Sequence, residues 1–261
     1  GVSYLDVTGA SHVDQHAMWI DPSEPSRLYL GNDGGFYSAL GGNWEKSLDL
    51  PITQFYAGSV DKNNALKVLG GTQDNNTLKT ESGPSNWNAM LGGDGFYCLT
   101  DPTNTNIIFA EWQFCCDRSG IRRSTTNGSG MATVSGFINT DRYNWSTPIV
   151  MSPANHNLLL VGSHRVYMST NNGVNFSPVS GDLTSNPGAA TVFGTISTLD
   201  ISGVNDSVFY AGTDDGRVWR SVNKGAAWTN ISAGLPLRSV TRVTADRFNS
   251  QVVYVTLSGF G

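Results

Sequence analysis

Charged residues are scarce in this chain of 261 residues. Asp, Glu, Lys and Arg together make up 14% of it, the formal net charge is -5, and Arg122 next to Arg123 is the densest basic spot. Proteins that bind nucleic acid concentrate positive charge where they meet the phosphates. The sequence therefore predicts that nucleic acid is not a partner.

Long hydrophobic runs and cofactor motifs are also missing. No apolar stretch approaches the roughly 20 residues that a membrane-spanning helix needs, so we expect no membrane span. The first residues do not have the pattern of a secretory signal peptide, and any targeting segment is expected to lie outside this sequence. There is no phosphate-binding glycine loop, Gly-x-Ser-x-Gly elbow or dinucleotide fingerprint. We expect no cofactor, with calcium or another divalent cation left open.

Cysteine is rare, and its pattern does not suggest a zinc site. The three residues are Cys98, Cys115 and Cys116, with neither a CxxC pair nor the Cys/His spacing of zinc ligands. A disulfide from Cys98 to either of the others is geometrically possible if Cys98 lies on a first strand and the adjacent pair follows the second strand. Three unpaired thiols are the alternative.

What the sequence does contain is a phrase that recurs about every 40 to 50 residues. It begins with an apolar run, a turn and a second apolar run that ends in Gly. A polar turn, an aromatic pair, Ser or Thr, another turn and a Trp follow. The copies cover residues 17–44, 56–87, 96–131, 148–176 and 196–228, and a sixth begins at Thr241. The 30 glycines and 10% aromatic residues suit short, tightly turned strands.

Each copy divides into four short strands. In the fifth copy these are residues 196–200, 208–212, 218–221 and 228–231, separated by Gly, Asn, Asp and Lys-Gly turns, which indicates a four-stranded antiparallel meander. Such a sheet has two apolar faces and cannot bury both alone. Packing several sheets around an axis buries them, so the sequence predicts an all-β fold, a β-propeller. A linear β-solenoid is the alternative.

The repeat predicts one propeller domain over residues 1–261, with five complete blades and part of a sixth. The expected blades cover about 12–50, 51–91, 92–144, 145–194, 195–238 and 239–261. The last copy stops where a second strand would finish. We therefore expect a fragment of a longer polypeptide, which would have six or seven blades in all.

The turn between the third and fourth strands carries a recognisable motif. Residues 221–228, Ser-Val-Asn-Lys-Gly-Ala-Ala-Trp, resemble the Asp-box, Ser-x-Asp-x-Gly-x-x-Trp, with Asn in place of Asp; residues 169–176 are similar, with Phe in place of Trp. Together with residues 28–37 and 70–75, these motifs resemble the sortilin-like and xyloglucanase-like Asp-box (BNR-repeat) propellers of secreted proteins. The resemblance covers essentially the whole chain and implies an extracellular or cell-surface location.

In that family the Asp-box is structural. Its polar side chains hydrogen-bond the hairpin backbone and its aromatic residue packs between blades, and Asn can bond the local backbone in the same way. The resemblance implies this scaffold role for Ser169, Asn171, Gly173, Phe176, Ser221, Asn223, Gly225 and Trp228.

Polar residues are expected to gather on one rim of the propeller. The turn between the second and third strands of a blade opens on the same face as the entry to its first strand. The predicted ligand-binding rim contains Asn32, Gln73, Asp74, Glu111, Trp112, Gln113, His164, Arg165 and Asp214. Carboxylates and amides beside aromatic rings suit a carbohydrate or a peptide. Since Asp and Asn also favour tight turns, turn chemistry is the alternative for any one of them.

Two aspartates stand out within this rim. Asp33 lies in Asn-Asp-Gly-Gly-Phe-Tyr and Asp94 in Gly-Gly-Asp-Gly-Phe-Tyr, which look like the sequences around the two catalytic carboxylates of xyloglucanase-like glycoside hydrolases. The resemblance implies that Asp33 and Asp94 act as acid and base, about 6.5 to 9.5 Å apart in an inverting enzyme. Those enzymes draw the pair from two propellers, whereas here the two aspartates fall in the first and third blades of one.

A candidate metal site lies at the start of the first blade. If His12, Asp14 and His16 alternate along an extended strand, their side chains point to one face and can converge on a cation. The alternative is that they bond a neighbouring blade or line the central channel. Calcium held by Asp14, Asp33, Asp74 and Asp94 is a second option.

The sequence supports three functional hypotheses. The first is a non-enzymatic, secreted or cell-surface propeller that binds a glycan or a protein partner through its polar rim. The second is a glycoside hydrolase acting on a β-glucan-like polysaccharide through Asp33 and Asp94. The third is a structural repeat domain within a large extracellular assembly.

Overall fold

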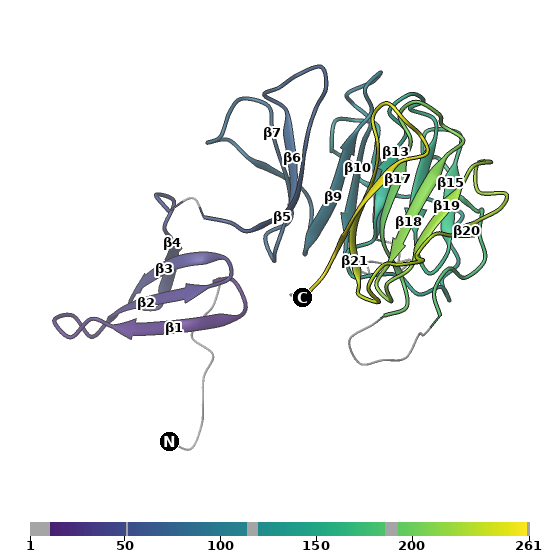
Figure 1. Cartoon of the computed structure of the whole chain (residues 1–261). Helices are drawn as coiled ribbons and strands as arrows, with labels where there is room; N and C mark the ends of the chain where they lie inside the picture. The colour runs from purple at the N-terminus through teal and green to yellow at the C-terminus, as the bar shows by residue number, and fades with distance from the viewer. Residues whose placement is uncertain (1–10, 51, 114–119, 186–192, 260–261) are drawn as a thin grey trace.

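The computed structural model describes residues 11–50, 52–113, 120–185 and 193–259. Strands, turns and bends make up these residues (Figure 1). In the described part of the chain, no helix has the length and apolar character that crossing a membrane requires. Cys98 is a buried thiol, whereas Cys115 and Cys116 lie outside the described residues, so the disulfide stays a prediction.

The strands form five four-stranded antiparallel sheets and one two-stranded sheet. The first sheet contains β1 (Gln15–Ile20), β2 (Arg27–Asn32), β3 (Gly35–Leu40) and β4 (Asn43–Lys46). The second contains β5 (Phe55–Val60), β6 (Val68–Thr72), β7 (Thr77–Thr80) and β8 (Asn88–Leu91). The third contains β9 (Gly95–Thr100), β10 (Ile108–Trp112), β11 (Ile121–Ser124) and β12 (Ala132–Thr133).

The remaining sheets follow the same order along the chain. The fourth contains β13 (Ile149–Met151), β14 (Leu159–Gly162), β15 (Val166–Ser169) and β16 (Ser177–Pro178). The fifth contains β17 (Ile196–Ile201), β18 (Phe209–Thr213), β19 (Val218–Ser221) and β20 (Thr229–Asn230). The sixth pairs β21 (Val240–Ala245) with β22 (Val253–Leu257). In every sheet the strands are neighbours in sequence order, as a meander requires.

The second to sixth sheets radiate from a common centre, which confirms the predicted β-propeller. The first strands of the second to sixth sheets, β5, β9, β13, β17 and β21, together line a central channel with a cavity of about 430 Å³. Arg242 on β21 reaches Tyr97 on β9, with its guanidinium carbon 5.9 Å from the ring centroid. First strands of sheets far apart in sequence would not meet in a linear solenoid. Figure 1 shows the first sheet to one side of this group.

The core lies between neighbouring sheets. β14 and β18 are buried along their whole length because sheets cover both of their faces, and they are therefore apolar without alternation. Leu160, Ile196 and Phe209 belong to one cluster that joins the fourth and fifth sheets. By contrast, every residue of β1 is exposed, so the first sheet lacks such cover.

The hairpins at residues 169–176 and 221–228 have the hydrogen bonds that a scaffold role requires. Ser169 Oγ accepts the N–H of Gly173 at 2.9 Å and donates to Asn171 Oδ1 at 2.8 Å. The matching bonds in the second hairpin run from Gly225 N to Ser221 Oγ at 2.9 Å and from Ser221 Oγ to Asn223 Oδ1 at 3.0 Å. The serine of each hairpin therefore hydrogen-bonds a backbone N–H of its own turn.

The aromatic residue of each hairpin packs against the preceding sheet. Phe176 is buried and stacks on Phe137 with ring centroids 5.0 Å apart, in the cluster that joins the third and fourth sheets. Trp228 packs on the cluster between the fourth and fifth sheets, and its Nε1 donates to Val179 O at 3.0 Å. These contacts attach one blade to the next.

Five of the six first strands contain a bulge near their start. The pairing with the second strand shifts between Gln15 and Ala17, between Phe55 and Ala57, and at the equivalent points of β9, β17 and β21. A bulge leaves one residue unpaired and re-aims its side chain. His16 and Tyr56 occupy this position in the first two sheets.

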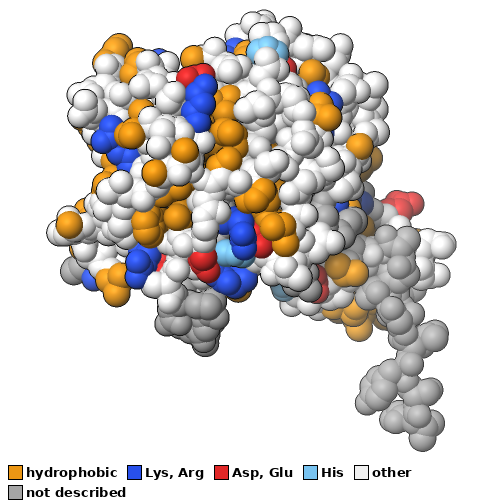
Figure 2. Space-filling model, turned by 90° about the vertical axis from the view of Figure 1, so that its right-hand side faces the viewer, with side chains coloured by type: hydrophobic (Ala, Val, Ile, Leu, Met, Phe, Trp, Pro, Cys, Tyr) orange, Lys and Arg blue, Asp and Glu red, His pale blue; other side chains and the backbone are white. Residues whose placement is uncertain are grey.

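Charge is sparse on the folded surface as well. On the face drawn in Figure 2, blue side chains are scattered and lie beside red ones, and no broad basic area is visible. That face offers no concentrated positive charge for a phosphate backbone.

Candidate ligand-binding groove

A polar cavity lies between the first and second sheets, where β2 and β6 end. It measures about 310 Å³ and is lined by Asn32, Asp33, Gly35, Ile52, Thr53, Gln54, Gln73, Asp74 and Asn75. Two hydrogen bonds to main-chain carbonyls join the sheets here. Asn75 Nδ2 donates to the carbonyl of Asp33 at 2.8 Å, and His12 Nε2 donates to the carbonyl of Asp74 at 3.2 Å. The turn residues of the two sheets thus form opposite walls of one cavity.

An aromatic cavity continues the polar one. It measures about 510 Å³ and shares Ile52, Thr53 and Asn75 with it; the other lining residues are Lys46, Phe55, Asn76, Leu78, Pro84 and Trp87. The rings of Phe55 and Trp87 lie 5.4 Å apart at an angle of 50°. We call the two cavities together the groove. It offers hydrogen-bonding groups at one end and aromatic surface at the other.

Three aspartates from three different sheets meet at the polar end. The backbone N–H of Asp74 donates to Asp94 Oδ1, and the carboxyl of Asp74 also contacts the carboxyls of both Asp33 and Asp94. Asp33 in turn accepts a hydrogen bond from His16 Nε2, at the bulge of β1. The structure therefore brings Asp33 and Asp94 to one common neighbour, although they belong to the first and third sheets.

Glycine makes this meeting possible. A Cβ at Gly71, near the end of β6, would lie 2.2 Å from the carbonyl carbon of Gly95, at the start of β9. Only a residue without a side chain permits such a close approach of two backbones. The approach places Asp94, one residue before β9, beside the turn that carries Asp74.

The environments of Asp74 and Asp33 move their pKa values in opposite directions. Burial, followed by the hydrogen bond to Asp33 and the charge of Asp94, raises the pKa of Asp74 to about 6. The hydrogen bond from His16, followed by that from Asp74, lowers the pKa of Asp33. Between these pKa values Asp74 carries a proton that it can donate, while Asp33 is ionised.

Several predicted rim residues lie at or beside this groove. Asn32, Gln73 and Asp74 line the polar cavity. Gln113 is attached to the third aspartate, because its backbone N–H donates to the carbonyl of Asp94 at 3.2 Å. Trp112 packs next to Gly93, the residue before Asp94.

Glu111, which was predicted in the turn at the rim, is a buried strand residue in the structure. It lies within β10 and not in the following turn, and it is fully buried. Burial raises the pKa of its carboxyl well above the usual value. The sequence places Glu111 directly before Trp112, so its position alone did not distinguish a strand residue from a turn residue.

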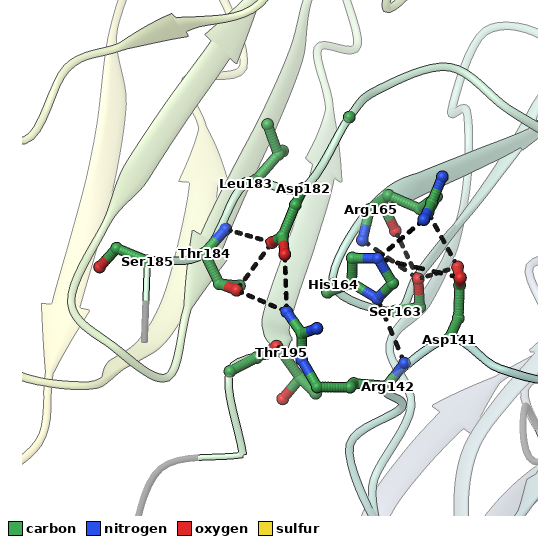
Figure 3. Close-up of polar contacts among 12 residues, drawn as sticks. Asp141, Arg142, Ser163, His164, Arg165, Asp182, Leu183, Thr184, Ser185 and Thr195 are labelled. Carbon is green, nitrogen blue, oxygen red and sulfur yellow. Dashed lines mark hydrogen bonds and ion pairs between the residues drawn. The ribbon is translucent and has the colours of Figure 1, made fainter. Parts of the chain in front are cut away.

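His164, Arg165 and Asp214 belong to a separate network, shown in part in Figure 3. His164 is buried, and its Nδ1 accepts the N–H of Arg142 at 3.2 Å; burial lowers its pKa. Arg165 Nε lies 3.0 Å from Asp141 Oδ2, and Asp214 Oδ1 accepts the N–H of Thr195 at 2.9 Å.

These three side chains are occupied by bonds to the connections that precede β13 and β17. Asp141, which also accepts a hydrogen bond from Ser163 Oγ at 3.0 Å, is the buried centre of the network. The sequence analysis missed this residue because it lies in the long connection before β13. The expectation of a single shared rim is therefore corrected to a groove and a separate structural network.

The predicted cation site is also corrected. Asp14 has a φ of 59° and precedes β1, so His12, Asp14 and His16 do not alternate along one strand. The ring nitrogens of His12 lie 3.0 Å from the carbonyl oxygen of Val13 and 3.2 Å from that of Asp74.

A different set of ligand atoms lies close together. One ligand atom each from Asp14, Asp33 and Asp74 lies within 4.8 Å of the others. Three carboxylates suit a hard cation such as calcium better than the predicted pair of histidines does. The set overlaps the second option from the sequence, without Asp94.

Sequence reasoning missed the aromatic half of the groove. Trp87 ends the second copy of the repeat and Phe55 directly precedes that copy, but nothing in their spacing distinguished them from core aromatic residues. The connection between β4 and β5 was a usable signal for this cavity. It contains Ile52 and Thr53, which belong to neither sheet and line the space between them.

No family model matches the chain, and no curated protein matches it. Among solved structures, a GH74 xyloglucanase from Xanthomonas campestris has a TM-score of 0.62 and 14% identity over 92% of this chain and 43% of its own. An ancestral GH74 enzyme has a TM-score of 0.60 and 20% identity over 91% of this chain and 33% of its own.

A third solved structure is not described as an enzyme. It is the extracellular domain of a putative one-component system from B. thetaiotaomicron, with a TM-score of 0.58 and 11% identity over 93% of this chain and 32% of its own. What these proteins share with the chain is the β-propeller fold. The chain spans less than half the length of each of them.

Proposed function

We propose that this protein binds a polysaccharide in the groove between its first and second sheets. The observation that carries the proposal is the continuity of the two cavities. Carboxylates and amides from Asp33, Gln73 and Asp74 form one end, and the rings of Phe55 and Trp87 form the other. Sugars require both kinds of surface, because their hydroxyls need hydrogen-bond partners while their C–H faces pack on aromatic rings.

The charge of the groove favours an uncharged polysaccharide. Asp14, Asp33, Asp74 and Asp94 lie at or next to its polar end, and Lys46 is the one basic residue among those that line the two cavities. Carboxylates or sulfates on a ligand would meet like charge there. An extracellular or cell-surface location agrees with a polysaccharide ligand, and one of the similar structures is described as an extracellular domain.

Calorimetric titration with an uncharged β-glucan and with a polyuronate tests this function. The wild type is expected to bind the β-glucan and not the polyuronate. Trp87→Ala and Gln73→Ala should each weaken binding to the β-glucan by about ten-fold, in keeping with about 1.4 kcal/mol for one lost contact. Asp206→Asn removes an acid of the surface pair with Lys224 and serves as the control. Equal binding by all four proteins would exclude the groove as the polysaccharide-binding site.

Hydrolysis of the same polysaccharide is the second candidate function. It is favoured by the opposite pKa shifts of Asp74 and Asp33, since a protonated and an ionised carboxyl are what a glycosidase uses. The carboxyls of Asp33 and Asp74 are nevertheless in contact, which is closer than the roughly 5 to 9.5 Å of glycosidase pairs. Binding therefore ranks first.

Release of reducing sugar from a β-glucan distinguishes the two functions. Hydrolysis predicts activity in the wild type that Asp74→Asn and Asp33→Asn both abolish while binding is retained. Binding without hydrolysis predicts no release from any of the three proteins. Activity that persists in both variants would exclude these aspartates as the catalytic pair.

A further inference from the structure

We propose that Tyr56 and Trp145 form a second sugar-stacking platform beyond the aspartates, so that the protein binds one linear chain reaching from Trp87 to Trp145. This inference rests on the proposed polysaccharide binding and names the ligand as an extended oligosaccharide. The two rings contact each other with centroids 6.0 Å apart at 69°, although they come from the second sheet and from the connection before the fourth.

The position of Tyr56 follows from the strand that carries it. Phe55 and Tyr56 are consecutive residues of β5, and the bulge at Tyr56 re-aims its side chain. Phe55 lines the groove, whereas Tyr56 stacks on Phe96 of the third sheet, with centroids 4.6 Å apart at 14°. The bulge between Phe55 and Ala57 leaves Tyr56 unpaired at the entry of the strand. One strand thus supplies a ring on each side of the second sheet.

The platform is rigid beneath and open above. Phe96 is only 4% exposed and contacts both rings, with its centroid 5.3 Å from that of Trp145. Tyr56 and Trp145 are 37% and 39% exposed. Two half-exposed rings on a buried third one form a preformed apolar surface, and covering it removes that surface from water without ordering new side chains.

The aspartates lie between the two aromatic surfaces. Tyr56 stacks on Phe96, two residues after Asp94, and the charges of Asp94 and Asp74 add to burial in raising the pKa of its phenol. Asp74 also borders the groove that contains Phe55. A ligand that crosses the aspartates from Trp87 therefore arrives at Tyr56, which also borders the central channel.

Binding measured as a function of ligand length tests the platform. β-1,4-linked gluco-oligosaccharides, from the disaccharide upward, are titrated into the wild type, Trp145→Ala and Trp145→Phe. The wild type should gain affinity with length until the chain reaches the platform. Trp145→Ala should lower the affinity for the longest chains by about ten-fold, the size of one lost stacking contact. It should leave the affinity for the shortest chains unchanged. Trp145→Phe, which keeps a ring, should retain most of the affinity.

Two further variants separate this inference from the function on which it rests. Trp87→Ala should weaken binding at every length. Phe248→Ala, which removes a ring that is 89% exposed in the turn between β21 and β22, should leave the affinity unchanged. If Trp145→Ala binds long chains as tightly as the wild type does, the proposed platform does not bind sugar, while polysaccharide binding in the groove is not contradicted. If the wild type binds no oligosaccharide of any length, both are wrong.

Discussion

The backbone N–H of Asp74 donates a hydrogen bond to the carboxylate of Asp94. This bond connects the turn after β6 with the residue just before β9, and so joins the second sheet to the third at the polar end of the groove. Because Asp74 also contacts Asp33, its carboxyl is the point where three sheets meet. The stability and the chemistry of the groove are therefore linked at this residue.

Asp74→Asn should make the fold more stable at neutral pH. The pKa of Asp74 is raised to about 6 in the folded protein from an ordinary value of 3.8. Because folding favours the protonated form, protonation of Asp74 contributes to the stability of the fold. This contribution is fully present below pH 3.8 and is lost as the pH rises through about 6. Asn keeps an N–H donor and cannot ionise.

Thermal unfolding at pH 4 and pH 7.5 checks this expectation. The melting temperature of Asp74→Asn should exceed that of the wild type at pH 7.5, and the difference should disappear at pH 4. Asp206→Asn should show no such change between the two pH values. A variant that is less stable than the wild type at pH 7.5 would contradict the sign of the shift.

His16→Ala should raise the pKa of Asp33. The hydrogen bond from His16 is the largest cause that lowers this pKa, and the bulge of β1 presents its ring to the carboxylate. A carboxyl-detected NMR titration of wild type and variant measures the effect. His156→Ala is the control: His156 pairs with Asp101 at 3.0 Å, so its removal should leave the pKa of Asp33 unchanged. An unchanged Asp33 titration in His16→Ala would show that the contact is absent in solution.

Gly71→Ala should destabilise the protein, whereas Gly31→Ala should be tolerated. Both glycines lie on the second strand of their sheets, but the added Cβ would lie 2.2 Å from Gly95 in the first case and meet nothing within 4 Å in the second. Overpacking of this kind costs about 1 to 3 kcal/mol. Urea unfolding measures both variants.

The same pair of variants tests how the groove is assembled. Gly71→Ala should also weaken polysaccharide binding, because it separates the turn of Asp74 from Asp94. Gly31→Ala should bind as the wild type does. Similar stabilities for the two variants would mean that the second and third sheets do not approach as closely as described.

Phe176→Ala should destabilise the fold by about 3 to 5 kcal/mol, the usual cost of truncating a buried Phe. The ring is buried in the cluster that joins the third and fourth sheets, where it stacks on Phe137. Val174→Ala, in the same hairpin but exposed, should change the free energy of unfolding by less than about 0.5 kcal/mol. Chemical denaturation measures both variants. Equal losses of unfolding free energy in Phe176→Ala and Val174→Ala would contradict the scaffold role of the hairpin.

The propeller was predictable because its cause is local. A four-strand period with Gly, Asn and Asp at the turns specifies a meander, and a sheet with two apolar faces has to pack between neighbours. The hairpin at residues 221–228 could be interpreted for the same reason: Ser221 and Asn223 bond within their own turn. The bulge that presents Tyr56 has no comparable signal, since it depends on how β5 pairs with β6.

The amino-acid sequence by itself determined the fold class, the strand order and the turn residues that approach the groove, since each follows from residues close together along the chain. Only the tertiary structure decided which of those residues meet. Asp33, Asp74 and Asp94 converge because Gly71 and Gly95 let two backbones touch. Glu111 is buried, and His164 bonds within the neighbouring network. Contacts between sheets depend on packing distances that no spacing in a sequence encodes.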